Sequence, residues 1–171
     1  MKNSQSANSG ISIQASLSGY SFKVALVPGS FFSEKDAREL LEAQTELGPE
    51  DKVFWVKLPA YDAVLLYSAP SKDALPELYT LIGTLERNAE YNKVHMCWKN
   101  GCLNLVIAQG KNLLLANVYA APDFTTAEYF IFLAMQQFQL NPEVTSICVG
   151  MPLTQEQEIS LYSYFKAVVR L

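Results

Sequence analysis

The residues best suited to hold a phosphate lie in one short stretch: Ser18, Gly19, Ser21 and Lys23. Two alternating apolar runs, residues 11–17 and 20–27, flank Ser18-Gly19, which is typical of a β-hairpin with its turn at those two residues. The hydroxyl and backbone N–H groups of such a turn can donate to phosphate oxygens, and Lys23 can supply a positive charge. The competing interpretation, an ordinary hairpin turn with Lys23 in solvent, is the favoured one.

A metal-ligating set of one imidazole and two thiols lies further along the chain: His95, Cys97 and Cys102. His95 and Cys97 share one face of a predicted strand, and Cys102 follows just across a turn. A structural zinc site needs four ligands, and the remaining cysteine, Cys148, is distant in sequence. Because unligated cysteine usually behaves as a small hydrophobic residue, we interpret the set as packed thiols beside a histidine and predict no metal site.

The sequence contains no residue pattern typical of a catalytic site. His95 is the only histidine, and no serine or aspartate pattern beside it indicates a triad. The acidic pairs are better explained as helix N-termini, loops and solvated surface. They are Glu34 with Asp36, Glu39 with Glu42, Glu50 with Asp51, and Asp123 with Glu128. We therefore predict no catalytic residue, and the sequence favours a protein that is not an enzyme.

The composition is that of a folded chain with a sizeable core. The 171 residues are 50% hydrophobic and 18% charged, and the net charge is -4. The 13 Lys and Arg are scattered singly, which argues against a nucleic-acid partner. No run has transmembrane length or the pattern of a signal peptide, and three cysteines are typical of free thiols. We expect a cytoplasmic protein without membrane insertion, with a flexible N-terminus over residues 1–10.

The first half predicts strands and two helices. Residues 20–27 form the second hairpin strand, which Pro28-Gly29 ends, with three side chains on its buried face: Phe22, Val24 and Leu26. A hydroxyl cap at Ser33 begins a helix that Gly48-Pro49 ends.

Two further strands and a second helix complete this half. Residues 52–58 and 63–67 are strand-like, and the sequence leaves open whether they pair as a hairpin. The regular part of the helix runs from Pro76 to about Asn88, with four side chains turned inward. They are Leu78, Leu81, Ile82 and Leu85.

The second half begins with a predicted meander of three strands. Residues 94–98 and 103–108 flank Asn100-Gly101, a dipeptide typical of a type I′ hairpin turn, and residues 113–119 add the third strand. An apolar helix follows, capped at Thr125 or Thr126, and its aromatic and aliphatic stripe is predicted to be core. The stripe consists of Tyr129, Phe130, Phe132, Leu133 and Phe138.

The end of the chain predicts a strand and a helix. Residues 145–149 are wholly apolar or small and bounded by Gly150, as in a buried parallel strand, and residues 154–171 have helical spacing. Three meander strands, a helix, a crossover strand and a helix follow the order of a ribonuclease-H-like unit. The two hairpin sequences SLSGYSF and WKNGCLN also indicate a degenerate internal duplication.

Two segments resemble a Bacteroidetes family of unknown function that is assigned to the actin-like ATPase superfamily. They are ISIQASLSGYSF and KNLLLANVYAAPDFTTAEYFIFLAMQQFQLNPEVTSICVG. The resemblance covers most of the chain and is densest over residues 94–150, and it consists of hydrophobic patterns and turns. It implies an α/β fold of the actin-like, ribonuclease-H-like kind, with two lobes of mixed sheet and flanking helices. The lobes are residues 11–90, which are divergent and shortened, and residues 91–171.

The resemblance also implies where a nucleotide would bind. In the actin-like superfamily the nucleotide lies between the lobes, and hairpin turns of both lobes face its phosphates. The corresponding positions are Ser18, Gly19, Ser21 and Lys23 in the first turn, Asn100 and Gly101 in the second, and Gly150 after the crossover strand. Neither hairpin turn carries the carboxylate that organises Mg²⁺ and water in that superfamily. ATP with Mg²⁺ is therefore not favoured as a cofactor.

These observations favour a non-catalytic actin-like interaction or scaffold protein with a protein partner or self-association. The alternative is a nucleotide-binding protein with a degenerate phosphate site, and a small-ligand binder or an unrecognised enzyme comes third. The scaffold hypothesis predicts an exposed apolar patch built from tyrosine or phenylalanine, or a homodimer.

Overall fold

The computed structural model describes residues 23–171, and its first sheet has three antiparallel strands. They are β1 (Lys23–Pro28), β2 (Val53–Leu58) and β3 (Ala63–Ser68), in the order β1-β3-β2. β2 and β3 pair as a hairpin across the short helix η3 (Pro59–Tyr61), which answers the question that the sequence left open. The predicted strand over residues 11–17 and its turn lie outside the described residues.

β1 is buried on both faces. Val24 and Leu26 lie in a core that the first sheet shares with the second, as predicted, and Phe22 lies outside the described residues. Ala25 and Val27 point the opposite way and pack in a separate core beneath α2 (Ala37–Glu42).

The helix predicted to reach Gly48 is shorter. It consists of the short turn η2 (Glu34–Asp36) and of α2, which ends at Glu42; another turn, η1 (Gly29–Phe31), precedes it. The Ser33 side chain makes no cap hydrogen bond within the described part of the chain. The loop after α2 folds back because Arg38 donates to the carbonyl of Gly48, so the chain leaves the helical path.

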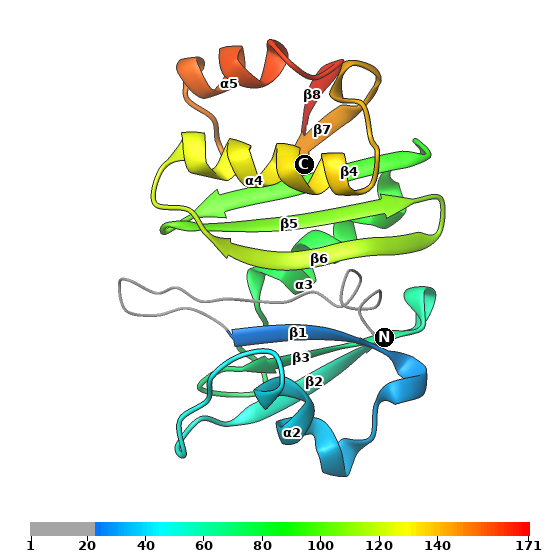
Figure 1. Cartoon of the computed structure of the whole chain (residues 1–171), viewed down its shortest axis with the longest axis vertical. Helices are drawn as coiled ribbons and strands as arrows, with labels where there is room; N and C mark the ends of the chain where they lie inside the picture. The colour runs from blue at the N-terminus through cyan, green and yellow to red at the C-terminus, as the bar shows by residue number, and fades with distance from the viewer. Residues whose placement is uncertain (1–22) are drawn as a thin grey trace.

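The second predicted helix is confirmed. It consists of α3 (Glu77–Gly83) and η4 (Thr84–Arg87), with Pro76 at the N-cap, and the four predicted side chains are buried. Figure 1 shows α3 between the two sheets, and its buried residues share one core with both of them. The boundary between the lobes at residue 90 stays a prediction, because the packing of α3 joins the sheets.

The second sheet has five strands in the order β6-β5-β4-β7-β8. They are β4 (Asn92–Lys99), β5 (Cys102–Gln109), β6 (Asn112–Ala120), β7 (Ser146–Val149) and β8 (Ala167–Arg170). β4, β5 and β6 form the predicted antiparallel meander, and β7 runs parallel to β4, as predicted. Asn100 and Gly101 have φ of 51° and 73°, which is the backbone of a type I′ turn.

The prediction of a helix over residues 154–171 is wrong for its second half. α5 (Gln155–Tyr162) begins as predicted with a capping box at Thr154. The chain then enters β8, which pairs in parallel with β7. The Lys166 amide donates to the Thr145 carbonyl at 3.0 Å and so starts this pairing. Two adjacent valines in β8 fit an extended backbone better than a helix.

α4 (Phe124–Gln137) and α5 cover the face of the second sheet opposite α3. The cap of α4 is Asp123, which accepts from the Thr126 amide at 2.7 Å, and not Thr125 or Thr126. A short turn, η5 (Pro142–Val144), leads from α4 into β7. The observed architecture is a mixed α/β fold with two sheets and flanking helices, as predicted. No helix within residues 23–171 is long and apolar enough to span a membrane.

Candidate functional site

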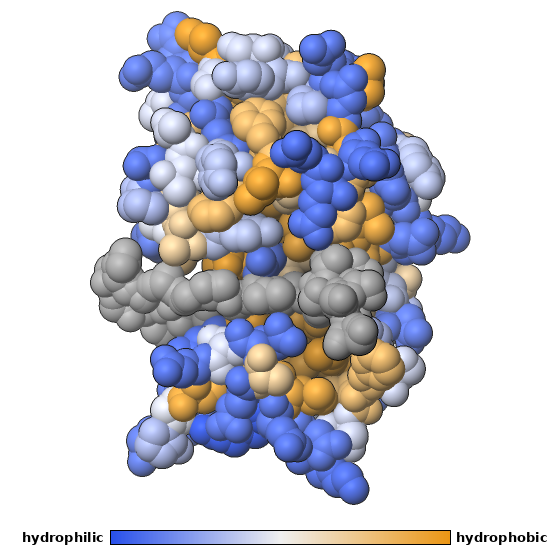
Figure 2. Space-filling model, viewed as in Figure 1, coloured by the Kyte–Doolittle hydropathy of each residue, from blue (hydrophilic) through white to orange (hydrophobic). Residues whose placement is uncertain are grey.

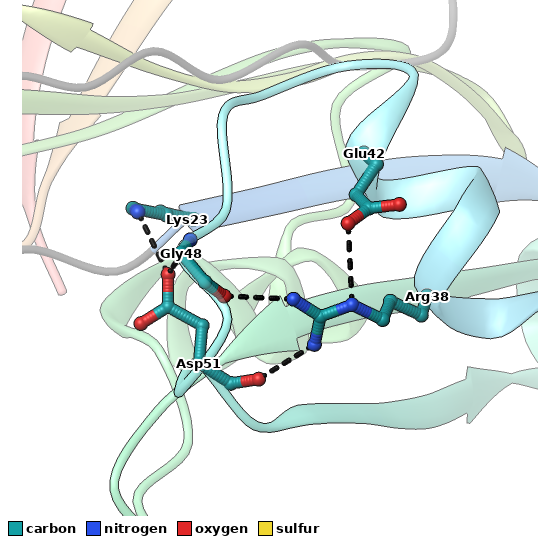
Figure 3. Close-up of polar contacts among 5 residues, drawn as sticks. All are labelled: Lys23, Arg38, Glu42, Gly48 and Asp51. Atoms are coloured by element: carbon teal, nitrogen blue, oxygen red, sulfur yellow. Dashed lines mark hydrogen bonds and ion pairs between the residues drawn. The ribbon is translucent and has the colours of Figure 1, made fainter.

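The first predicted phosphate site is only partly described by the structure. Ser18, Gly19 and Ser21 lie outside the described residues. Lys23 begins β1, and Figure 1 shows that β1 begins on the side of the molecule where β4 ends. The ammonium of Lys23 lies 2.9 Å from Oδ2 of Asp51, an oxygen that also accepts from the Gly48 amide at 2.7 Å (Figure 3). The charge of Lys23 is therefore balanced within the protein.

Arg38 holds the same loop in place. Its guanidinium donates to the carbonyls of Asp51 and Gly48, both at 2.7 Å, and to the Glu42 carboxylate at 3.2 Å (Figure 3). The hydrogen bond from the Gly48 amide lowers the pKa of Asp51, and Lys23 lowers it further. Lys23 and Asp51 are 28 residues apart, so no local sequence signal connected them.

Replacing Arg38 with alanine tests the role of this loop. Arg38→Ala removes two charge-assisted hydrogen bonds to backbone carbonyls, and we expect it to lower the free energy of unfolding by about 2 kcal/mol. Urea unfolding measures the change. Arg87→Ala, at an exposed arginine of η4, is the control and is expected to cost less than about 0.5 kcal/mol. Equal losses in the two variants would contradict a specific role for Arg38.

The second predicted turn and Gly150 are held by backbone hydrogen bonds. The Gly150 amide donates to the Met96 carbonyl at 2.8 Å, and the Gly101 carbonyl accepts from the Ala121 amide at 2.8 Å. Gly150 thus lies beside the end of β4, and Asn100-Gly101 forms the tip of the β4–β5 hairpin. No hydrogen bond among the described residues joins these positions to Lys23.

A carboxylate that the sequence reasoning missed lies beside the second hairpin. Glu77, the first residue of α3, forms an ion pair with Lys99 at 3.1 Å. Burial, together with the nearby Glu77, raises the pKa of the Cys97 thiol to about 11, so this thiol is protonated at neutral pH. A lysine-paired carboxylate and a protonated thiol supply neither a Mg²⁺ site nor a nucleophile. Residues 23–171 contain no cluster of three or more acidic, histidine or cysteine side chains that could hold a metal.

His95 is a fully buried core residue with both ring nitrogens engaged. Its Nδ1 lies 2.8 Å from Oγ1 of Thr84, and its Nε2 lies 2.9 Å from Nδ2 of Asn88. The Asn88 amide nitrogen can only donate, so Nε2 accepts and the proton of the neutral ring lies on Nδ1. Burial, with Lys93 nearby, lowers the pKa of His95 to about 4. Asn88 also donates to the Cys148 thiol at 3.6 Å, so His95 and Cys148 are both held by Asn88 in the protein interior.

A pocket of about 390 Å³ lies where the turn between β2 and β3 meets α3. Its lining includes one cation, one carboxylate and two phenols: Lys57, Glu86, Tyr61 and Tyr79. Burial raises the pKa of Tyr61, and the charge of Glu86 raises it further. One lysine opposed by one glutamate is a poor match for a triphosphate, which needs several cations or backbone amides.

The outer surface of α4 carries residues that the sequence predicted to be buried in the core. Tyr129 and Leu133, predicted as core, are 59% and 46% exposed, because α4 buries only Ala127, Ile131, Ala134 and Met135. Figure 2 shows apolar side chains reaching the surface over α4 and β6.

Aromatic contacts extend this surface to both sides of the helix. Phe130 stacks on Tyr119 with ring centroids 4.7 Å apart, and Phe132 meets Tyr164 at 4.8 Å. We name six residues the α4 face: Tyr119, Tyr129, Phe130, Phe132, Leu133 and Tyr164.

The two sheets and their helices have the actin-like ATPase fold. A crystal structure from Bacteroides thetaiotaomicron, described as a protein with actin-like ATPase fold and unknown function, matches with a TM-score of 0.73. The sequences are 13% identical, and the match covers 87% of this chain and 65% of that one. At this identity the likeness shows the fold alone.

Residues 72–168 match the family described as "Protein of unknown function (DUF3822)", and the chain belongs to that family. No curated protein matches the chain. The predicted membership in a family of unknown function with an actin-like fold is confirmed, and neither comparison indicates an activity.

Proposed function

We propose that this chain is a non-catalytic protein-interaction module of actin-like fold and that the α4 face is its binding surface. The observation that carries the proposal is the exposure of Tyr129 and Leu133 within residues 129–135 of α4, an uninterrupted apolar run that covers all sides of the helix. A helix segment that is apolar on all sides is normally buried on all sides. In this protein the second sheet covers only the side of α4 that carries Ile131, and the side that carries Tyr129 and Leu133 is exposed.

The chemistry of the α4 face supports a protein partner. Four of its six members are tyrosine or phenylalanine of α4 or its neighbour β6, and aromatic residues are enriched in the cores of protein interfaces. Glu128 is the only charged residue among the fourteen of α4, and it accepts a hydrogen bond from Ser160 at 2.6 Å. The face thus presents apolar and phenolic groups without an opposing charge.

Two of the groups proposed for a nucleotide are engaged in other contacts, which supports a non-catalytic role. Lys23 is paired with Asp51, and the Gly150 amide donates to the Met96 carbonyl of β4. A nucleotide would have to displace each of these partners, and that cost lowers its affinity.

The three cysteines are free thiols, two buried and one half-buried. Free thiols persist in reducing compartments, which supports placing this module in the cytoplasm.

Photo-crosslinking in the source organism tests the proposal. A benzophenone amino acid at position 133 is expected to give a covalent adduct, because the face is occupied by a partner. The same amino acid at position 31 is the matched control, since Phe31 is 65% exposed but lies in the first lobe. Absence of any adduct from position 133, or equal adducts from both positions, would contradict the proposal.

A further inference from the structure

We propose that the partner on the α4 face is a second copy of this chain, bound by antiparallel packing of α4 on α4 about a two-fold axis. This inference rests on the proposed function, because it names the occupant of the same face. It is carried by the position of the exposed residues along α4, by the distribution of charge, and by the size of the face.

The two exposed side chains lie close to the middle of the helix. α4 runs from Phe124 to Gln137, so its midpoint lies between Phe130 and Ile131. Tyr129 and Leu133 are four residues apart and lie on one side of the helix, on either side of that midpoint. A two-fold axis level with Ile131, beside that midpoint, places Tyr129 of one copy against Leu133 of the other.

The charge distribution fits self-association at this face. Each copy carries a net charge of -4, so two copies meet most easily where neither presents a charge. In a two-fold interface, a residue near the axis meets the same residue of the other copy. A charge near the axis would therefore meet a like charge. Glu128 is turned to Ser160 of α5, so the line from Tyr129 to Leu133 is free of charge. Antiparallel packing also sets the helix dipoles in the favourable sense.

The size of the face indicates a weak dimer. Fourteen helical residues span about 21 Å, and Tyr119 and Tyr164 widen the contact on both sides of α4. A stable interface buries about 800 Å² per partner, and a single helix pair falls at the lower end of that range. We therefore expect a reversible dimer with a dissociation constant on the order of micromolar.

Sedimentation equilibrium of the purified chain tests the dimer. The wild type is expected to pass from monomer to dimer as its concentration rises through the micromolar range. Leu133→Glu places a carboxylate in the apolar contact and is expected to weaken dimerisation at least about 100-fold. Leu75→Glu is the matched control, because Leu75 is similarly exposed at 41% but lies before α3, and it is expected to leave dimerisation unchanged.

Disulfide trapping tests the antiparallel register, and it does so even if Leu133→Glu fails to fold. In a Cys102→Ser background, Tyr129→Cys and Leu133→Cys chains of different mass are mixed and oxidised. Cys97 and Cys148 are buried and stay in both chains. We expect the mixed disulfide between positions 129 and 133 to exceed both same-position disulfides.

Three results would overturn the inference: a monomer at all concentrations, a dimer insensitive to Leu133→Glu, or same-position disulfides in excess. A monomer whose position 133 crosslinks to a different protein in cells would overturn the second copy as partner and leave the interaction module intact. A position 133 that crosslinks to nothing overturns the module itself.

Discussion

Acidification from pH 7 to pH 4 is expected to lower the free energy of unfolding by about 3 kcal/mol through His95. The unfolded histidine has the ordinary pKa of 6.5, whereas burial holds the native pKa at about 4. Between these values the unfolded chain binds a proton that the native chain does not, so stability falls as the pH falls. The contribution is fully present above pH 6.5 and is lost by about pH 4.

Urea unfolding across this pH range measures the effect, with His95→Gln as the reference. Asp51 and Asp123 also have lowered pKa values and lose stabilising contacts in acid, so the difference between wild type and His95→Gln isolates the histidine. His95→Gln is expected to be less stable at pH 7 and to have a flatter pH dependence. Because the chain has one histidine, its proton NMR signal reports directly. A native His95 that titrates near pH 6.5 would contradict the buried neutral ring.

Leu81→Ala is expected to destabilise both lobes together, by about 3 kcal/mol. Leu81 is 2% exposed and lies in the core that contains α3 and residues of both sheets. Its removal leaves a cavity between the sheets. Leu75→Ala, at an exposed leucine six residues earlier, is the control and is expected to cost less than about 1 kcal/mol.

The two tryptophans allow each lobe to be followed separately. Trp55 lies in β2 of the first sheet and Trp98 in β4 of the second. In Trp55→Phe and Trp98→Phe backgrounds, the remaining fluorescence should give one shared unfolding midpoint, which Leu81→Ala shifts equally. Separate midpoints, or a shift seen by one tryptophan alone, would show that the core does not couple the lobes.

The elements set by local chemistry could be predicted from the sequence. Asn100-Gly101 specified its hairpin because both residues tolerate positive φ, and the short apolar run before Gly150 identified the buried parallel strand β7. The apolar spacing of α3 likewise identified its buried side chains. In each case the signal lies within about ten consecutive residues.

Features decided by distant contacts could not be predicted. β8 continues the apolar spacing of α5, and its pairing with the distant strand β7 fixes it as a strand. Lys23 pairs with Asp51, which lies 28 residues away, so the local sequence around Lys23 carries no signal of this contact.

The exposure of α4 was missed for a related reason. The apolar run over residues 129–135 predicts burial on all sides of the helix, whether the covering surface belongs to the same chain or to another. The residues of the candidate site were therefore predicted to be part of the core.

Backbone amide NMR of one labelled sample, as a protein concentration series and then as a MgATP titration, tests the central claim most directly. If the chain is a non-catalytic interaction module, raising its concentration should shift the amides of α4 and neighbouring β6, and MgATP should shift none. Shifts caused by MgATP at Lys23, at the Asn100-Gly101 turn and at Gly150, with an α4 that is insensitive to concentration, would contradict the account.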